Sequence, residues 1–199
     1  YERTRSAGKK MDRDELNRFL ALVKKMALDV DGSAYRMMLR NDAFYFMRLG
    51  HFVERADNTA RLLDVKFHVL LPDAETVGGS LDYFQWSSIL RAVSANTAYH
   101  WVYRQSVKPW LVADLLILKP DMPRSLIACY ENIVRWLDLL GRLYGRQGKA
   151  QRHARAMLAK LESADLNSIF QNGLHEFIES FIAENDKLDL VMAEQYLVH

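Results

Sequence analysis

The residues from Phe44 to Leu71 place apolar and polar side chains with the period of an α-helix. Successive residues turn by about 100° around a helix, so the two kinds fall on opposite sides. The apolar side predicts a core face, formed by Tyr45, Leu49, Phe52, Val53, Ala56, Ala60, Leu63 and Phe67. The polar side holds His51, Glu54, Asp57, Asn58, Arg61 and His68, with Arg48 and Arg55 at its border. This polar stripe exceeds what solubility requires and is the best candidate site.

The same periodicity predicts helices along the rest of the chain. The expected ranges are Asp12 to Asp29, Asn41 or Asp42 to Leu71, Ser80 to Arg104, Pro109 to Leu118, Pro123 to Tyr144, Lys149 to Leu161, and Asp165 to Leu197. Asp31-Gly32 and Pro72 are the predicted breaks at the ends of the first two helices. No strand pattern of useful length appears. The sequence therefore predicts an all-α fold, an irregular bundle of about six to eight helices without a sheet.

Composition indicates a globular protein. The chain has 199 residues, of which 50% are hydrophobic, and its mean hydropathy is -0.18. This is enough apolar material for one sizeable core, so residues 1–199 are expected to form a single helical domain. No apolar run is long enough for a membrane helix. The one cysteine, Cys129, excludes an internal disulfide, fits the cytoplasm and is expected to be a packed core thiol.

Charges separate in the last third of the chain. Residues 141–160 carry arginine and lysine and no acid, whereas residues 161–199 are acidic and contain Lys187 as their only lysine or arginine. One interpretation is a pair of neighbouring helices whose faces attract each other. The other is an anionic partner on the basic helix. Nucleic acid is disfavoured as that partner, because Tyr144 is the only aromatic residue of the basic stretch and no binding motif is present.

Motifs that define an enzyme or a cofactor site are absent. There is no phosphate loop, paired cysteine set, zinc-protease helix or nucleophile elbow. The order of His51 and Glu54 is the reverse of the diiron pattern, so no metal site and no cofactor are predicted. The tryptophans lie at helical positions beside apolar residues and are expected to pack in the core or between helices: Trp86, Trp101, Trp110 and Trp136.

Two further arginines are candidates for anion binding. Arg91 lies in the middle of a predicted helix among apolar residues, and Arg124 follows Pro123 at a helix start, where free backbone amides favour anions. With Arg55 or Arg61 they would line a pocket for a carboxylate or phosphate, which the guanidinium group binds with two hydrogen bonds. Equally, each arginine would pair with a carboxylate and tie helices together. Both interpretations stay open.

The stretch Leu49-Gly50-His51-Phe52-Val53-Glu54-Arg55-Ala56-Asp57-Asn58-Thr59-Ala60-Arg61-Leu62-Leu63 resembles the signature of the bacterial alpha-E domain family. Later blocks resemble that family in the same order: Leu81-Asp82-Tyr83-Phe84-Gln85-Trp86, Leu90-Arg91-Ala92-Val93-Ser94-Ala95, Val112-Ala113-Asp114-Leu115-Leu116-Ile117-Leu118, and Pro123-Arg124-Ser125-Leu126. The chain departs from the pattern at His51, where the family usually has arginine or lysine. Family members are generally longer, so the resemblance implies a C-terminal part that lacks an upstream helical block. The apolar surface so exposed would favour self-association.

The resemblance also implies a context. Alpha-E proteins accompany ATP-grasp ligases and transglutaminase-like or peptidase proteins, in systems inferred to form or modify peptide amide bonds. We therefore expect a helical component of such a system that is inactive alone. It would either contribute an active-site surface, with an anion-binding polar cleft around the Glu-Arg motif, or dock the ligase. Its candidate catalytic residues are Glu54 and Arg55, and its candidate ligand-binding residues are His51, Asp57, Asn58, Arg61, Arg91 and Arg124. The alternative is a structural interaction module without a ligand. On either hypothesis, Glu54 is expected to be buried or in a cleft and hydrogen-bonded to an arginine.

Overall fold

The computed structural model describes residues 12–69 and 80–197. These residues confirm the all-α fold and contain no strand, but they form nine helices rather than six to eight. The chain divides into two compact units, residues 1–44 and 45–199. The helices are α1 (Arg13–Met37), α2 (Asp42–Val69), α3 (Ser80–Ala92), α4 (Asn96–Tyr103), α5 (Pro109–Ile117), α6 (Leu126–Leu143), α7 (Lys149–Glu162), α8 (Leu166–Asn172) and α9 (Leu174–Tyr196).

The first unit contains α1 and the start of α2. Asp12 caps α1 in a reciprocal arrangement: its carboxylate accepts from the amide of Glu15 at 2.7 Å, and Glu15 accepts from the amide of Asp12 at 3.2 Å. The predicted break at Asp31-Gly32 is wrong, because α1 continues to Met37. A glycine inside a helix costs only about 1 kcal/mol relative to alanine, which a helix of 25 residues tolerates.

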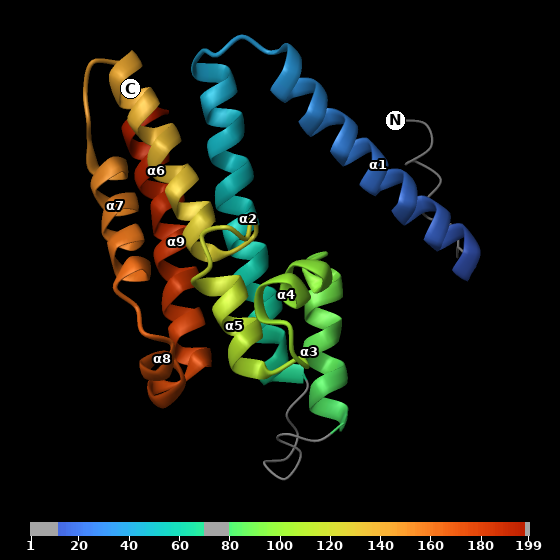
Figure 1. Ribbon diagram of the computed structural model, residues 1–199. Helices are drawn as coiled ribbons and strands as arrows, with labels where there is room; N and C mark the ends of the chain where they lie inside the picture. Colours follow the sequence, from blue (N-terminus) through green and yellow to red (C-terminus); the bar gives the residue numbers. More distant parts are fainter. Residues whose placement is uncertain (1–11, 70–79, 198–199) are drawn as a thin grey trace. The chain divides into compact units, whose positions relative to one another are not determined.

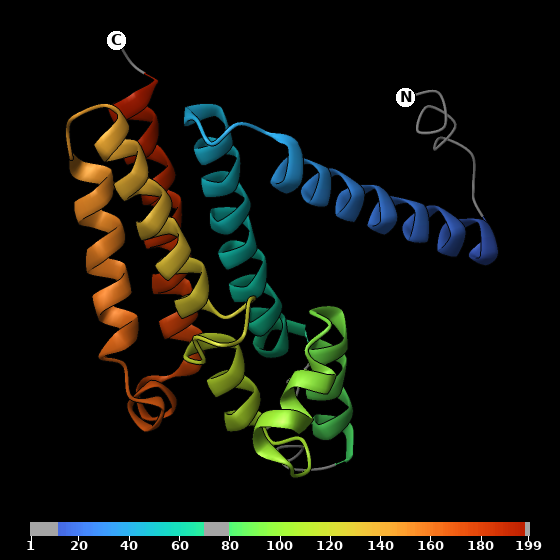
Figure 2. The same ribbon diagram turned by 45° about the horizontal axis from the view of Figure 1, so that its top comes forward.

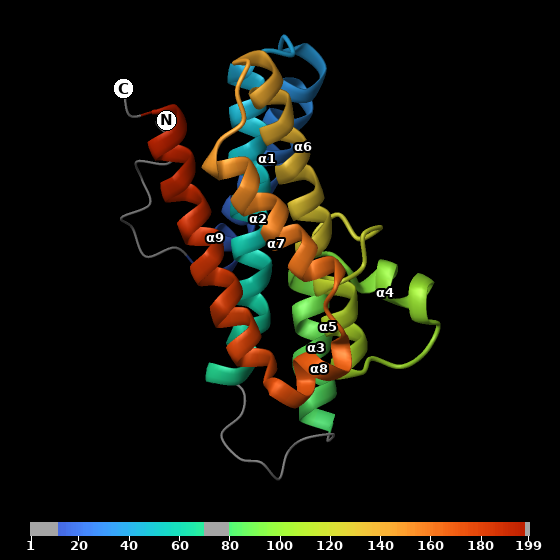
Figure 3. The same ribbon diagram turned by 90° about the vertical axis from the view of Figure 1, so that its left-hand side faces the viewer.

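In the second unit, α2, α6, α7 and α9 run side by side (Figures 1 and 2). The shorter helices α3, α4 and α5 gather where α2 ends, and α8 joins the ends of α7 and α9 (Figure 3). The predicted apolar stripe of α2 is confirmed as core from Leu49 to Leu63, whereas Tyr45 is half-buried and stacks on Trp136. Leu71, the expected end of α2, lies outside the described residues. No helix of the described residues is long and apolar enough to cross a membrane.

Two long predicted helices are each broken in the structure. The helix expected from Ser80 to Arg104 is two helices, because Ser94 adopts a left-handed conformation with φ 56° between α3 and α4. The helix expected from Asp165 to Leu197 is split at Gly173, where φ is 102°. This positive φ is a backbone conformation that residues other than glycine rarely adopt. Apolar spacing continues through both breaks, so periodicity alone did not reveal them.

The expectation that all four tryptophans pack in the core or between helices is wrong for Trp101, which is 74% exposed. Trp86 and Trp136 are buried, whereas Trp101 and Trp110 are exposed. The helix α4 has eight residues and turns Tyr99 into the core. Trp101 lies two positions later, on the far side of the same short helix. By contrast, Pro109 begins α5, and Cys129 is fully buried, both as predicted.

The charge separation of the last third partly reflects neighbouring helices. Lys149 of α7 pairs with Glu194 of α9 at 3.6 Å, and Nε2 of His153 lies 3.4 Å from a carboxylate oxygen of Glu184. These contacts support the interpretation that the basic and acidic helices attract each other across α7 and α9. The Lys149–Glu194 pair is exposed, and exposed ion pairs contribute about 0.2–1 kcal/mol each.

A buried amide links three helices of the second unit. Asn185 of α9 is 1% exposed, and its Oδ1 accepts from the hydroxyl of Tyr130 on α6 at 2.9 Å. Its Nδ2 donates to the main-chain oxygen of Val53 on α2 at 3.4 Å. A buried polar side chain is stable only when it is hydrogen-bonded. Asn185 therefore selects one arrangement of α2, α6 and α9.

Replacing Asn185 with alanine tests this link. Asn185→Ala strands the Tyr130 hydroxyl in the core and is expected to lower the free energy of unfolding by about 1–3 kcal/mol. The exposed Asn167 in α8 provides the matched control, and Asn167→Ala should change stability by less than about 0.5 kcal/mol. Urea unfolding followed by circular dichroism measures both. Equal, small effects of the two substitutions would contradict the role of Asn185.

Candidate functional site

Arg55 points from α2 toward the loop that precedes α6. One terminal nitrogen, Nη1, donates to the main-chain oxygen of Pro123 at 3.3 Å. The other, Nη2, bonds Nε2 of His51 one turn earlier on α2. A guanidinium group only donates, so Nε2 of His51 accepts and the ring proton lies on Nδ1. Arginine or lysine at position 51 could not accept this bond, which gives the departure at His51 a structural role.

Thr59 holds the next residue of the same loop. It lies one turn after Arg55, is 1% exposed, and its hydroxyl donates to the main-chain oxygen of Arg124 at 2.9 Å. Ser125 then begins α6: its hydroxyl accepts from the amide of Ala128 at 3.1 Å and donates to the main-chain oxygen of Lys119 at 2.6 Å. Two consecutive carbonyl groups are thus bound by α2, and the start of α6 is fixed against it.

The start of α6 also brings two candidate arginines into one neighbourhood. Burial raises the pKa of the Cys129 thiol to about 12, and the positive charges of Arg55 and Arg124 oppose that rise. Both arginines therefore lie close enough to act on the same thiol. Cys129 stays protonated at neutral pH, which makes it a packing residue rather than a nucleophile. The Arg124 side chain itself is exposed.

Glu54 lies on a different side of α2. It is exposed, and its Oε1 accepts a hydrogen bond from the side-chain nitrogen Nδ2 of Asn58 at 3.0 Å. The expectation that Glu54 is buried or in a cleft and bonded to an arginine is therefore wrong. Adjacent residues of a helix point in directions about 100° apart. Because Arg55 faces the loop before α6, Glu54 turns toward solvent.

The carboxylates beside Glu54 extend onto α9. Arg61 pairs with Asp57 through Nε at 2.7 Å, and this hydrogen bond is the main cause that raises the pKa of Arg61. The pKa of Asp189 is raised by partial burial and then by the negative charges of Asp186, Asp57 and Glu54. These groups therefore form one electrostatic neighbourhood. We call it the Glu54 surface; its members are Glu54, Asp57, Asn58, Arg61, Asp186 and Asp189.

Arg91 belongs to neither group. It is exposed on α3, where Nη2 donates to the hydroxyl of Ser88 at 3.1 Å. Its guanidinium carbon lies 5.4 Å from the centre of the Phe84 ring. Both contacts are made within α3. The predicted site residues thus divide into three places: the start of α6 with His51, Arg55 and Arg124, the Glu54 surface, and α3 with Arg91.

Residues missed by the sequence analysis hold the site together. Asn185 interrupts the apolar seam of α9 between Phe181 and Leu188, and a polar residue at a core position is the signal that could have identified it. Thr59 lies four residues after Arg55, so its side chain leaves α2 on the same face. In addition, Nδ1 of His175 on α9 bonds a carboxylate oxygen of Asp64 on α2 at 2.6 Å.

The three cavities described below lie away from the polar stripe of α2, and the described residues contain no cluster of metal ligands. Within the described residues, no group of three or more histidine, cysteine or acidic side chains is arranged to hold a metal ion. Three surface cavities of about 470–510 Å³ lie on α4, between α7, α8 and α9, and beside the turn from α6 to α7. Residues of the Glu-Arg pair line none of these three.

The chain belongs to a known family. A family model described as Alpha-E, a predicted alpha-helical domain with a conserved ER motif, matches residues 2–197. We assign this motif to Glu54-Arg55, within the signature that carries the resemblance. The match begins at residue 2 and does not support the interpretation of the chain as only the C-terminal part of a longer member. No curated protein and no solved structure matches the chain.

The two residues of the motif are expected to differ in their effect on stability. Arg55→Ala removes the bonds to Pro123 and His51 and should lower the free energy of unfolding by about 1–2 kcal/mol, as for a partly screened bond from a charged donor. Glu54→Ala removes one exposed contact and should change it by less than about 0.5 kcal/mol. Urea unfolding compares them. A larger loss for Glu54→Ala would contradict the assignment.

His175 predicts a pH dependence of stability. Its hydrogen bond to Asp64 is the main cause that raises its pKa above 6.5, with further contributions from Glu179 and Glu176. The stabilisation is complete below about pH 6.5 and is lost as the pH rises through the raised pKa. His175→Gln should therefore cost about 0.2–1 kcal/mol at pH 5.5 and less at pH 8.5. Thermal melts at both values test this, and an equal cost at both would contradict it.

Proposed function

We propose that this chain is a cytoplasmic, non-catalytic helical component of a bacterial ATP-grasp-associated system that ligates or modifies peptides. The observation that carries the proposal is that the two side chains of the Glu-Arg motif point in different directions. Arg55 is engaged inside its own unit, by Pro123 and His51. Glu54 lies on the surface among further carboxylates. A motif divided in this way builds the fold with one residue and presents the other to a partner.

The contacts of the arginines favour docking over ligand binding by an arginine cluster. Arg61 is already paired with Asp57. Arg91 lies away from it on α3, where it donates to Ser88 of the same helix. A pocket for carboxylate or phosphate needs guanidinium groups that converge with free donors. The start of α6, with Arg55 and Arg124, is the one place where two of the predicted arginines share a neighbourhood, and there Arg55 donates to a main-chain oxygen.

The Glu54 surface suits a partner with a basic patch. Four carboxylates from α2 and α9 lie near one arginine, so the surface has a net negative charge. Complementary charges speed the association of proteins and fix their orientation. We propose the ATP-grasp ligase as the partner that binds here, with transglutaminase-like or peptidase proteins as further members of the system. The competing function is a structural interaction module that takes no part in the reaction.

Reconstitution with the ATP-grasp ligase proposed as the partner tests the docking function. The variant Glu54→Lys/Asp186→Lys reverses two charges of the Glu54 surface and should weaken binding at least about tenfold, because like charges then oppose each other. Glu162→Lys, at the exposed end of α7, is the matched control and should bind like the unchanged chain. Biolayer interferometry measures binding, and mass spectrometry follows the peptide product.

Product formation separates the two functions. Docking predicts that product falls in parallel with binding in the double variant. Binding that is lost while product formation continues unchanged would favour the structural module. Robust ATP hydrolysis by the isolated chain, which contains no phosphate loop, would contradict the non-catalytic role.

A further inference from the structure

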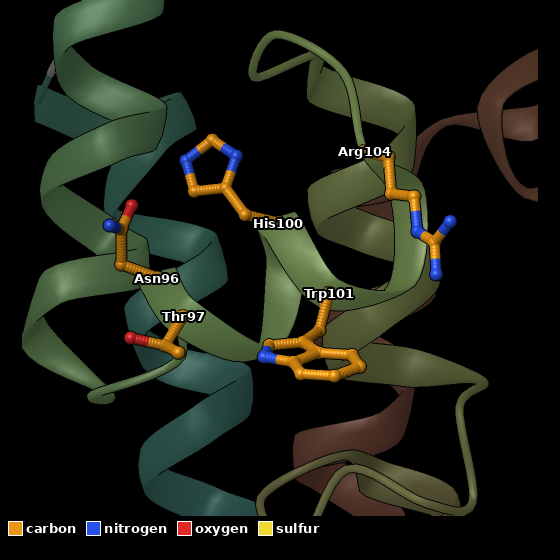
Figure 4. A pocket seen from close by; sticks show the side chains of 5 residues that line it. All are labelled: Asn96, Thr97, His100, Trp101 and Arg104. Atoms are coloured by element: carbon orange, nitrogen blue, oxygen red, sulfur yellow. The ribbon is translucent and has the colours of Figure 1, made fainter.

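The helix α4 carries an exposed tryptophan beside a cavity. Trp101 is 74% exposed, and the neighbouring Val102 is also exposed. A shallow, open depression of about 510 Å³ lies along this side of the helix and is lined by Asn96, Thr97, His100, Trp101 and Arg104. Figure 4 shows Trp101 between Thr97 and Arg104 in that view. We call this feature the α4 groove. It is separate from the Glu54 surface, which lies on α2 and α9.

The chain around the α4 groove contains no negative charge over a long stretch. From Tyr83 to Ala113 there is no aspartate or glutamate, whereas Arg91, Arg104 and Lys108 are all present. Arg104 forms no ion pair with a carboxylate of the described residues. The groove therefore offers a cation whose charge is not neutralised within this part of the protein.

Arg104 occupies a backbone position that usually belongs to glycine. It ends α4 with φ 51°, in the left-handed region, and its amide donates to the main-chain oxygen of His100 at 3.1 Å. A side chain other than glycine or asparagine is uncommon there and costs about 1 kcal/mol. Arginine at this position places a positive charge at the rim of the groove, three residues after Trp101.

Hydrogen bonds hold the groove in shape. The buried hydroxyl of Tyr99 donates to the main-chain oxygen of Ser106 at 2.9 Å and accepts from the amide of Lys108 at 3.0 Å. The hydroxyl of Tyr103 donates to a carboxylate oxygen of Asp114 at 2.5 Å. These bonds fix α4 to the loop after it and to α5. A surface fixed in this way loses little conformational freedom when it binds a partner.

We propose that the α4 groove binds an acidic segment of a partner protein that carries a large apolar side chain. The apolar side chain packs against Trp101, and carboxylates of the segment face Arg104 and His100. Exposed aromatic residues with an arginine are typical of the residues that dominate protein interfaces. Nucleic acid fits less well, because its binding surfaces are much more strongly positive and here the cations are few.

A labelled peptide provides the probe. It has about twelve residues, of which about half are glutamate or aspartate and about a quarter are leucine or phenylalanine, with fluorescein at its N-terminus. Fluorescence anisotropy should give a Kd of roughly 10–100 µM for the full chain, and the Kd should rise with salt because screening weakens charge attraction. In a second peptide, every glutamate is replaced by glutamine and every aspartate by asparagine, and the apolar residues are kept. It should bind at least about fivefold more weakly.

Two pairs of variants locate the binding site. Trp101→Ala and Arg104→Gln should each raise the Kd at least about fivefold. Trp110→Ala and Arg142→Gln change another exposed tryptophan and another exposed arginine and should leave the Kd within about twofold. Circular dichroism melts verify that all four variants are folded, as expected for exposed side chains.

Several results would overturn the proposal. These are the absence of peptide binding, equal binding of the amide peptide, and equal effects of the groove variants and their controls. A labelled single-stranded oligonucleotide is measured alongside. If it binds more tightly than the acidic peptide and loses affinity in Trp101→Ala and Arg104→Gln, the groove is a nucleic-acid site and the proposal is wrong.

Discussion

The position of the Glu-Arg pair depends on one buried amide. Asn185 of α9 receives a hydrogen bond from Tyr130 of α6 and donates one to the main-chain oxygen of Val53, the residue immediately before Glu54. A different rotation of α2 about its axis would take the Val53 oxygen away and leave Nδ2 of Asn185 without this acceptor in the core, which is costly. With the rotation fixed, Arg55 meets the loop before α6 and Glu54 meets solvent.

The second unit carries two surfaces of different character, and the constraint from Asn185 places one of them. Asn185 is followed on α9 by Asp186 and Asp189, so the residue that fixes α2 also brings these carboxylates toward Glu54 and Asp57. The α4 groove, by contrast, lies in a stretch with no acid and exposes Trp101. A protein with an acidic surface and a separate aromatic and cationic groove is suited to hold two partners, which agrees with the proposed role as a non-catalytic component.

The sequence predicted the helices better than it predicted their breaks or the directions of polar side chains. Apolar spacing identified the core face of α2 because burial of that face follows directly from helix geometry. The breaks at Ser94 and Gly173 were missed, because a single left-handed residue leaves the spacing unchanged. Glu54 was placed wrongly because its surroundings depend on α9, far away in the sequence. Asn185 and Thr59 were missed because their partners lie on other elements.

Arg55 holds the start of α6, whereas Glu54 does not. Amide hydrogen exchange of the peptides that cover Lys119 to Cys129 measures this difference, with Arg55→Gln and Glu54→Gln compared under identical conditions. Exchange in this region should be faster in Arg55→Gln, because the loop loses its bond from α2. It should be unchanged in Glu54→Gln. Equal protection of the region in both variants would show that Arg55 does not hold the start of α6.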